Sequence, residues 1–134
     1  MDNPWKKFVP QVPTRQGSAD WFTGQVYLSE LIVSPEPMSL TVARVFFSPG
    51  ARTHWHTHPK GQILHVEAGI GWFQRTGEDV LEIKAGDTIY IPPGEKHWHG
   101  ASAAHAMTHL ALQAAENGKT ADWLEPVSDQ SYHL

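Results

Sequence analysis

Residues 54–62, HWHTHPKGQ, place three imidazoles and one amide within nine residues. His54, His56 and His58 alternate, so their side chains share one face if the segment is extended. Neighbouring members then start about 6.6 Å apart, and two of them can lean onto one ion. The outer pair starts about 13 Å apart, which is too far for all three to share it. The segment therefore predicts two adjacent histidine ligands for a metal ion.

The turn that follows decides between the two adjacent pairs. Residues 59–61, Pro-Lys-Gly, form a turn that brings Gln62 back towards His58. This favours the pair His56 and His58 over the pair His54 and His56. We therefore expect His54 to lie near the rim of the site without binding the ion.

A second polar cluster, residues 94–100 (GEKHWHG), follows a Pro-Pro-Gly turn. An ion held by two histidines and Gln62 needs a further ligand, and this cluster is where we expect it. Imidazole and carbonyl oxygen suit manganese, iron, cobalt, nickel or zinc. The chain has no cysteine, which excludes disulfides, thiolate metal sites and cysteine nucleophiles. The alternative is a hydrogen-bonded polar cluster that holds no ion.

Short β-type runs separated by turn residues must position these groups, and they predict a sandwich or a barrel. The clearest expected strands are residues 40–47, 62–67, 71–75, 80–83, 88–91 and 107–113. Short helical turns could form only at residues 114–118, 121–125 and 128–132. The strings ADWFTG and ADWLEP, which begin at Ala19 and Ala121, look alike, but one short echo does not establish a repeat.

Alternation within these strands assigns side chains to faces. If Arg44 points to water and Gln62 points inwards, their strands present apolar side chains to the interior. His109, Ala111 and Gln113 share a face of the last strand, which is typical of a cavity wall that carries polar groups. The residues expected to line a substrate pocket are Ala43, Val45, Phe47, Thr53 and Leu64.

Length and charge narrow the classes of protein. A chain of 134 residues is long enough for one domain with a core, and a net charge of −4 gives no electrostatic case for nucleic acid or an anionic membrane. No apolar run approaches the roughly 20 residues that span a bilayer. Residues 1–18 are polar and interrupted by proline, without the apolar stretch of a secretory signal. We expect a cytoplasmic protein with an extended arm, residues 1–18, and one domain, residues 19–134.

Two spacings resemble the motifs of the cupin superfamily. The first motif, G-x5-H-x-H-x3,4-E-x6-G, matches Gly50, His56, His58, Gln62 and Gly69, with glutamine in place of glutamate. The second, G-x5-P-x-G-x2-H-x3-N, matches Gly86, Pro92, Gly94 and His97, with Ala101 in place of asparagine. The resemblance covers about residues 40–113. It implies an all-β fold, a small antiparallel β-barrel of the cupin or jelly-roll type with little helix, and one metal ion held by His56, His58, Gln62 and His97.

A narrower resemblance concerns the strings DWFTG, WHTHP, GEKHWHG and AMTHLA. They are similar to those of the bacterial cupin hydroxynitrile lyases, manganese-dependent enzymes that cleave cyanohydrins to an aldehyde and hydrogen cyanide. The resemblance implies manganese as the divalent ion, with iron, nickel, zinc and cobalt as alternatives. It adds His99, His109 and Gln113 as catalytic residues. The alternative is that these three are hydrogen-bonded residues with a purely structural role. His54 departs from that family, which has a small residue there. Because many cupins dimerise, we also expect a homodimer or a higher homo-oligomer.

Gln62 favours Lewis-acid chemistry over redox cycling. Three neutral histidines, a glutamate and a divalent ion carry a net charge of about +1, whereas glutamine leaves it at about +2 and should raise the reduction potential. We therefore expect a metal-dependent carbon–carbon lyase for small hydroxynitriles, in which His109 or His99 takes the hydroxyl proton and cyanide leaves towards Gln113. The alternatives are an iron-dependent cupin oxygenase, which Gln62 disfavours, and a non-catalytic cupin that binds a small molecule.

Overall fold

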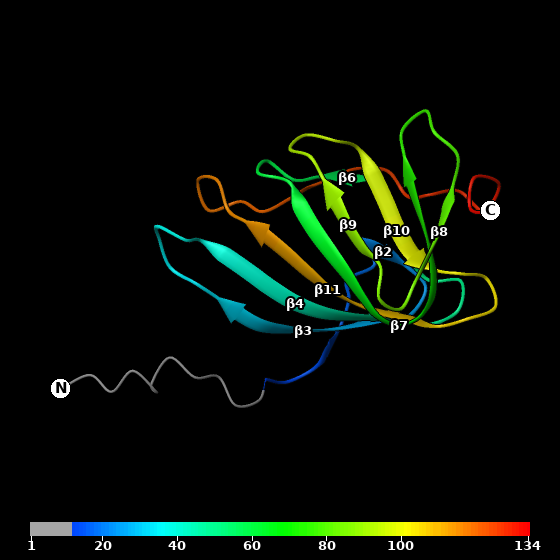
Figure 1. Cartoon of the computed structure of the whole chain (residues 1–134), viewed down its shortest axis with the longest axis horizontal. Helices are drawn as coiled ribbons and strands as arrows, with labels where there is room; N and C mark the ends of the chain where they lie inside the picture. Colours follow the sequence, from blue (N-terminus) through cyan, green and yellow to red (C-terminus); the bar gives the residue numbers. More distant parts are fainter. Residues whose placement is uncertain (1–11) are drawn as a thin grey trace.

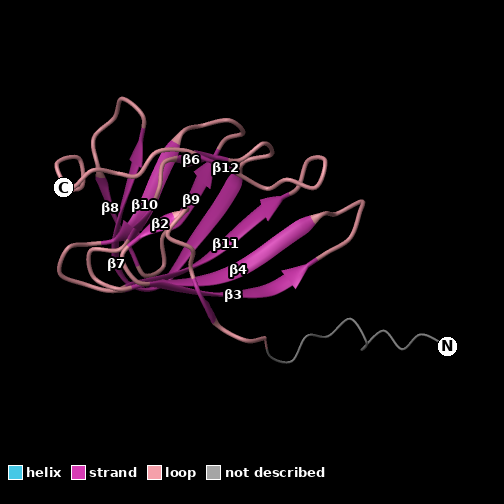
Figure 2. Cartoon of the chain, turned by 180° about the vertical axis from the view of Figure 1, so that it is seen from behind, coloured by secondary structure: helices cyan, strands magenta, loops and turns pink. Residues whose placement is uncertain are grey.

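The computed structural model describes residues 12–134, and these residues form strands and loops without a helix (Figures 1 and 2). The strands are β1 (Arg15–Gln16), β2 (Phe22–Thr23), β3 (Val26–Val33), β4 (Leu40–Phe47), β5 (Arg52–Thr53), β6 (His56–Thr57), β7 (Gln62–Arg75), β8 (Leu81–Lys84), β9 (Thr88–Ile91), β10 (His97–Ala101), β11 (Met107–Ala114) and β12 (Asp122–Trp123). Within this part of the chain, nothing has the helical length and apolar character that a membrane-crossing helix requires.

All strand pairs are antiparallel, and the main path through the sheet is β1-β3-β4-β11-β7-β10-β5-β2. The sheet curls along this path into a half-barrel, with β3, β4 and β11 on one side and β10, β8 and β6 on the other (Figure 1). The expected all-β architecture with an antiparallel, barrel-like sheet is therefore confirmed.

One strand joins the two halves of the sheet. The runs 62–67 and 71–75, expected as separate strands, are the two parts of the continuous strand β7. Its first part pairs with β9 and β11, and its second part pairs with β8 and β10. Gly69, with a φ of 82°, lies between the parts. Glycine adopts this conformation without steric cost, so the residue bends the strand rather than ending it.

The C-terminal residues contain no helix, in contrast to the short helical turns considered for them. Residues 122–123 form β12, and residues 128–132 make one turn in which the N–H groups of Ser131 and Tyr132 donate to the carbonyl of Ser128. Seven strands were not expected, namely β1, β2, β3, β5, β6, β10 and β12, of which β3 and β10 are the longest. In β10 all five residues are buried, so the alternation that reveals a half-exposed strand is missing.

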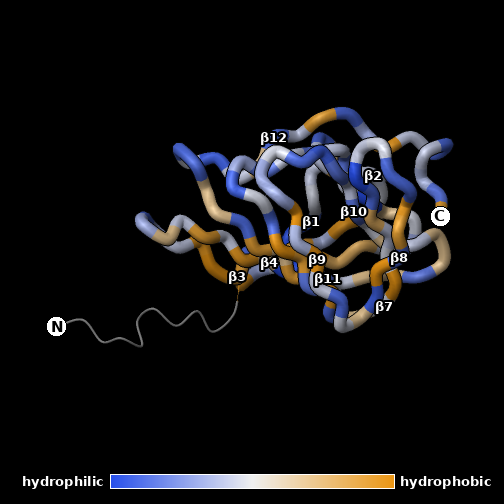
Figure 3. Tube along the Cα trace, turned by 45° about the horizontal axis from the view of Figure 1, so that its top comes forward, coloured by the Kyte–Doolittle hydropathy of each residue, from blue (hydrophilic) through white to orange (hydrophobic). Residues whose placement is uncertain are grey.

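The apolar core lies on the concave side of the sheet. Alternate residues of β4 and β7 are buried there, among them Val45, Phe47, Leu64 and Val66, while Arg44 and Glu67 pair with each other on the outer face. Figure 3 shows apolar residues along β3, β4, β9 and β11 and more hydrophilic ones in the loops that connect the strands. The expected inward and outward faces of these strands are therefore confirmed.

The end of the expected N-terminal arm belongs to the sheet. Arg15 and Gln16 pair with Leu28 and Tyr27 of β3, so β1 forms an edge strand before residue 19. Residues 1–11, the larger part of that arm, lie outside the described residues.

Candidate metal centre and cavity

A cavity of about 220 Å³ opens into the concave side of the half-barrel. One wall is apolar and comes from β2, β3, β4 and β11: it contains Phe22, Leu28, Ala43, Val45, Phe47 and Ala111. The other end is polar and contains Thr53, His56, His58, Gln62, His99, His109 and Gln113. The cavity thus joins an apolar compartment to a dense group of histidines.

Strand register brings the two histidine clusters of the sequence together. β6 pairs with β10 in a register that sets His56 opposite His97, and their ring centroids lie 4.2 Å apart. The ring of His58 lies 4.9 Å from that of His56 and 5.4 Å from that of His97. All three side chains are buried. The three rings therefore converge although 41 positions separate His56 from His97 in the numbering.

The tautomer of these three histidines follows from their hydrogen bonds. The Nδ1 atoms of His56, His58 and His97 lie 2.8, 2.7 and 2.9 Å from backbone carbonyl oxygens of His54, Thr120 and Glu95, respectively. A carbonyl oxygen can only accept, so each Nδ1 carries the proton and each Nε2 is left with a free lone pair. Histidine ligands of metal ions are typically anchored in this way.

Gln62 turns its oxygen towards the same point. Its Nε2 donates to Oε1 of Gln113 at 3.0 Å, and its own Oε1 lies 3.3 Å from Nε2 of His97. Since Nε2 of His97 is unprotonated, two lone pairs face each other across this gap. Imidazole nitrogens and an amide oxygen directed at one point suit a divalent cation such as manganese, iron or zinc.

The structure also brings His99 into this group. The ligand atoms of His56, His97 and His99 all lie within 4.8 Å of one another, a three-histidine site that suits a single metal ion. The motif resemblance predicts His58 among the ligands and His99 beyond them. Nε2 of His58 is buried and has no hydrogen-bond partner within residues 12–134, so it too is free to bind an ion.

His99 and His109 form a pair of a different kind. Nε2 of His109 lies 3.1 Å from Nδ1 of His99, so the two rings share one proton. Within the described residues, the outer nitrogens, Nε2 of His99 and Nδ1 of His109, are buried without a partner. If His99 donates, its Nε2 is the free base; if His109 donates, the free base is its Nδ1. The pair can therefore hold or release a proton at either end.

Burial keeps these histidines neutral. Desolvation is the main cause that lowers the pKa of His97 to about 3 and the pKa of His109 to about 4. Burial likewise lowers the pKa of His56, His58 and His99 below the ordinary value, and neighbouring histidines add to the effect for His56 and His99. At neutral pH the rings are uncharged, so their free nitrogens can bind a cation or accept a proton.

Of the remaining residues predicted for the site, all but Leu64 line the cavity. Ala43, Val45, Phe47 and Thr53 line the cavity. Leu64 is fully buried in the core and is not among the lining residues. Gln113 lines the cavity beside Gln62.

His54 contributes through its backbone. Its side chain does not line the cavity, but its carbonyl orients His56 and its N–H donates to the carbonyl of Trp21. It is buried rather than placed at a rim.

Sequence reasoning missed Trp21, Thr120 and Trp123, all of which line the cavity. The echo between ADWFTG and ADWLEP was the available signal for the two tryptophans, because their rings stack at 5.4 Å. Nothing in the sequence pointed to Thr120, which acts through its backbone carbonyl.

Comparisons with known proteins agree with this geometry. The family model described as "Cupin domain" matches residues 43–111. The chain is 55% identical over 126 residues to an (R)-mandelonitrile lyase of Granulicella tundricola, a match that covers 94% of this chain and 96% of that protein. It is 30% identical over 81 residues to an acireductone dioxygenase of a Picosynechococcus species, covering 58% of this chain and 46% of that protein. The crystal structure of a cupin-like protein from Thermotoga maritima superposes with a TM-score of 0.83 at 40% identity, over 87% of this chain and 89% of the other.

Proposed function

Because this chain belongs to the cupin domain family, we propose that it is a metal-dependent hydroxynitrile lyase, which cleaves cyanohydrins such as mandelonitrile to an aldehyde and hydrogen cyanide. The observation that carries the proposal is the 55% identity, over nearly the full length of both chains, to a protein named (R)-mandelonitrile lyase. The polar end of the cavity supports it, because it combines a metal-type ligand set with a hydrogen-bonded pair of neutral bases, His99 and His109.

The residues that would hold the ion are His56, His58, Gln62 and His97, with His99 close enough to add a further nitrogen. We propose manganese as the native ion. When bound, a divalent cation here would supply Lewis acidity towards a hydroxyl oxygen, and the neutral Gln62 would leave its charge uncompensated.

The chain's own groups account for the proton and for the leaving group. The free nitrogen of His99 or His109 accepts the hydroxyl proton as the carbon–carbon bond breaks, and the bonding electron pair leaves with cyanide. The oxygen of Gln113 is engaged by Gln62, so its amide nitrogen is the atom that donates to the departing cyanide. The imidazolium then returns the proton to cyanide, which gives hydrogen cyanide and restores the neutral pair.

The apolar wall sets the class of substrate. Ala43, Val45 and Phe47 line the cavity, and the ring of Phe47 lies 5.2 Å from that of His109. An aromatic or aliphatic group fits there, while the hydroxyl and nitrile groups face the polar end. We propose a small-molecule substrate with no nucleic-acid or membrane partner, a homo-oligomeric assembly and a cytoplasmic location.

The test is a cleavage assay on purified protein loaded with Mn²⁺. Racemic mandelonitrile should release benzaldehyde well above the buffer blank, and the reverse reaction from benzaldehyde and cyanide should give one enantiomer in excess. Protein stripped with a chelator is the control and should fall to the blank. Cleavage no faster than the blank, or equal rates with and without metal, would contradict the proposal.

A cupin oxygenase is the second candidate, since the chain also matches an acireductone dioxygenase. That match covers less than half of the other protein, and Gln62 disfavours redox cycling. Iron-loaded protein should therefore consume no oxygen with cyanohydrin or enediol substrates in an oxygen-electrode assay. A non-catalytic binding protein would retain metal and turn over neither class of substrate.

A further inference from the structure

Trp21 and Trp123, the tryptophans of the two similar strings ADWFTG and ADWLEP, stack on each other beside the candidate metal centre. Trp123 lies in β12, which pairs with β6 and sets Trp123 opposite His56. Its ring stacks on the imidazole of His56, with centroids 4.5 Å apart and planes inclined by 27°. It also stacks on Trp21, at 5.4 Å and 12°, and Phe22 packs against it at 5.8 Å. A run of parallel rings thus leads from a buried histidine to Trp21, which is 39% exposed.

This stack supplies a constraint that the side-chain hydrogen bond of His56 does not. The bond from Nδ1 of His56 to the carbonyl of His54 fixes one direction in the ring plane. That bond does not by itself prevent the ring from rocking about the bond axis, which would swing Nε2 out of line with the other ligands. A flat indole packed 4.5 Å from the imidazole opposes this rocking, because one edge of the tilting ring would move into the indole and the other away from it.

The same short segment holds a second ligand. The carbonyl of Thr120 accepts the proton on Nδ1 of His58 at 2.7 Å. Residues 120–123 therefore contact both histidines of the H-x-H motif, although they lie beyond the residues 43–111 that match the family model.

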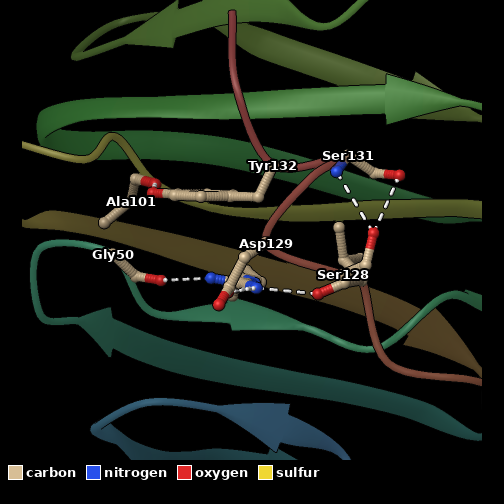
Figure 4. Close-up of polar contacts among 8 residues, drawn as sticks. Gly50, Ala101, Ser128, Asp129, Ser131 and Tyr132 are labelled. Atoms are coloured by element: carbon tan, nitrogen blue, oxygen red, sulfur yellow. Dashed lines mark hydrogen bonds and ion pairs between the residues drawn. The ribbon is translucent and has the colours of Figure 1, made fainter.

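The end of the chain ties this segment to the sheet. Nη2 of Arg52, in β5, donates to the carbonyl of Val127 at 2.7 Å and to Oδ1 of Asp129 at 2.8 Å. The guanidinium of Arg52 lies 4.3 Å from the ring centroid of Tyr132, whose hydroxyl donates to the carbonyl of Ala101 in β10 (Figure 4). These contacts fasten the chain that follows Trp123 to β5 and β10.

We propose that Trp123 is a positioning residue of the metal centre, holding the imidazole plane of His56 so that Nε2 points at the ion. The proposal rests on the metal assignment of the proposed function but not on the reaction. Its test therefore reads metal affinity and ligand geometry, so a failure of the lyase assay leaves it standing, and its own failure leaves the lyase assay unaffected.

The decisive comparison is Trp123→Phe against Trp123→Leu in the full chain. Both fill the site with apolar volume, but only phenylalanine offers a flat face to His56. Metal affinity is measured by titrating Co²⁺ into chelator-stripped protein, and the visible absorption of the bound Co²⁺ reports the arrangement of its ligands. Trp123→Leu should bind Co²⁺ about 10- to 100-fold more weakly, which is typical when a group that orients a metal ligand is lost, with an altered spectrum. Trp123→Phe should stay within a few-fold of the parent and keep its spectrum.

Trp55→Ala is the matched control. Trp55 flanks His56, and its backbone pairs with Leu124 and Glu125, but its ring lies beside Lys96 rather than on a histidine. This variant should keep both Co²⁺ affinity and spectrum. Equal affinities for Trp123→Leu and Trp123→Phe would overturn the proposal, as would a loss of affinity in Trp55→Ala as large as in Trp123→Leu. Thermal unfolding of the metal-free variants identifies any that lose affinity through lost stability; a Trp123→Leu effect explained wholly in that way would also overturn it.

Discussion

The cavity holds two sets of histidines that differ in how their protons are fixed. His56, His58 and His97 each donate from Nδ1 to a backbone carbonyl, and a carbonyl cannot give a proton back. His99 and His109 bond to each other, and either ring can be the donor. The first set therefore has one tautomer, whereas the second has two.

Under the proposed function, this difference separates metal binding from proton transfer with a single type of side chain. A metal ligand benefits from a fixed lone pair, because any change of tautomer would block the bond to the ion. A general base must gain and lose a proton in each turnover, so a shared proton and a free nitrogen suit it. His99 lies between the two sets, since it pairs with His109 while a ligand atom of its ring lies within 4.8 Å of those of His56 and His97.

The largest expected effect is the loss of metal from the first set. His56→Ala and His97→Ala should each abolish copurifying metal, because each removes one of the few nitrogens directed at the ion. Elemental analysis of the purified variants measures this. His54→Ala is the control and should leave the metal content unchanged, since the group that bonds to His56 is its backbone carbonyl, which the substitution keeps. Metal that persists in His97→Ala would refute the ligand assignment.

The second set should affect rate and not metal content. His109→Ala removes the partner of His99 without touching the anchored ligands, so turnover of mandelonitrile should fall on the order of 10²-fold or more. Elemental analysis should show the parent's metal content. If His109→Ala loses metal as His97→Ala does, the division into two sets is wrong.

Acid should reveal that both sets are neutral in the folded protein. Their pKa values are lowered by burial, so below about pH 6.5, where histidine in an unfolded chain becomes charged, the unfolded state binds more protons than the folded state. The unfolding free energy of metal-free protein should therefore decrease on acidification, by about 1.4 kcal/mol per pH unit for each such histidine. Urea titrations between pH 8 and pH 5 measure the change in unfolding free energy per pH unit. His109→Gln should reduce this slope by the contribution of one histidine. An unchanged slope in that variant would show that His109 is already charged in the folded state.

The smallest expected effect comes from Gln62→Glu, which leaves both sets of histidines in place. The carboxylate should keep the ion, bind it more tightly and lower turnover by a few-fold, because it neutralises one unit of charge at the site. Metal titration and the mandelonitrile assay measure the two effects. A gain in turnover would show that the charge argument has the wrong sign.

Local patterns were sufficient for much of the fold. The run 40–47 predicted β4 to the residue because one side of that strand faces the core and alternates with a solvated side. The turn residues around residues 88–91 likewise delimit β9. Alternation failed at β10, where both faces are covered, and at Gly69, where a glycine bends a continuous strand rather than closing it.

For the site, the sequence by itself determined which residue types were available and which short-range pairs could act together. The spacing of His56 and His58, the nearby Gln62 and the shared face of His109 and Gln113 are local properties of extended chain.

The tertiary structure alone decided the tautomers, the place of His99 between the two sets and the contact of Trp123 with His56. Each depends on strand register, which sets His97 opposite His56 and Trp123 opposite the same residue. Register is settled when the whole sheet buries its apolar face, so no short stretch of the sequence contains it.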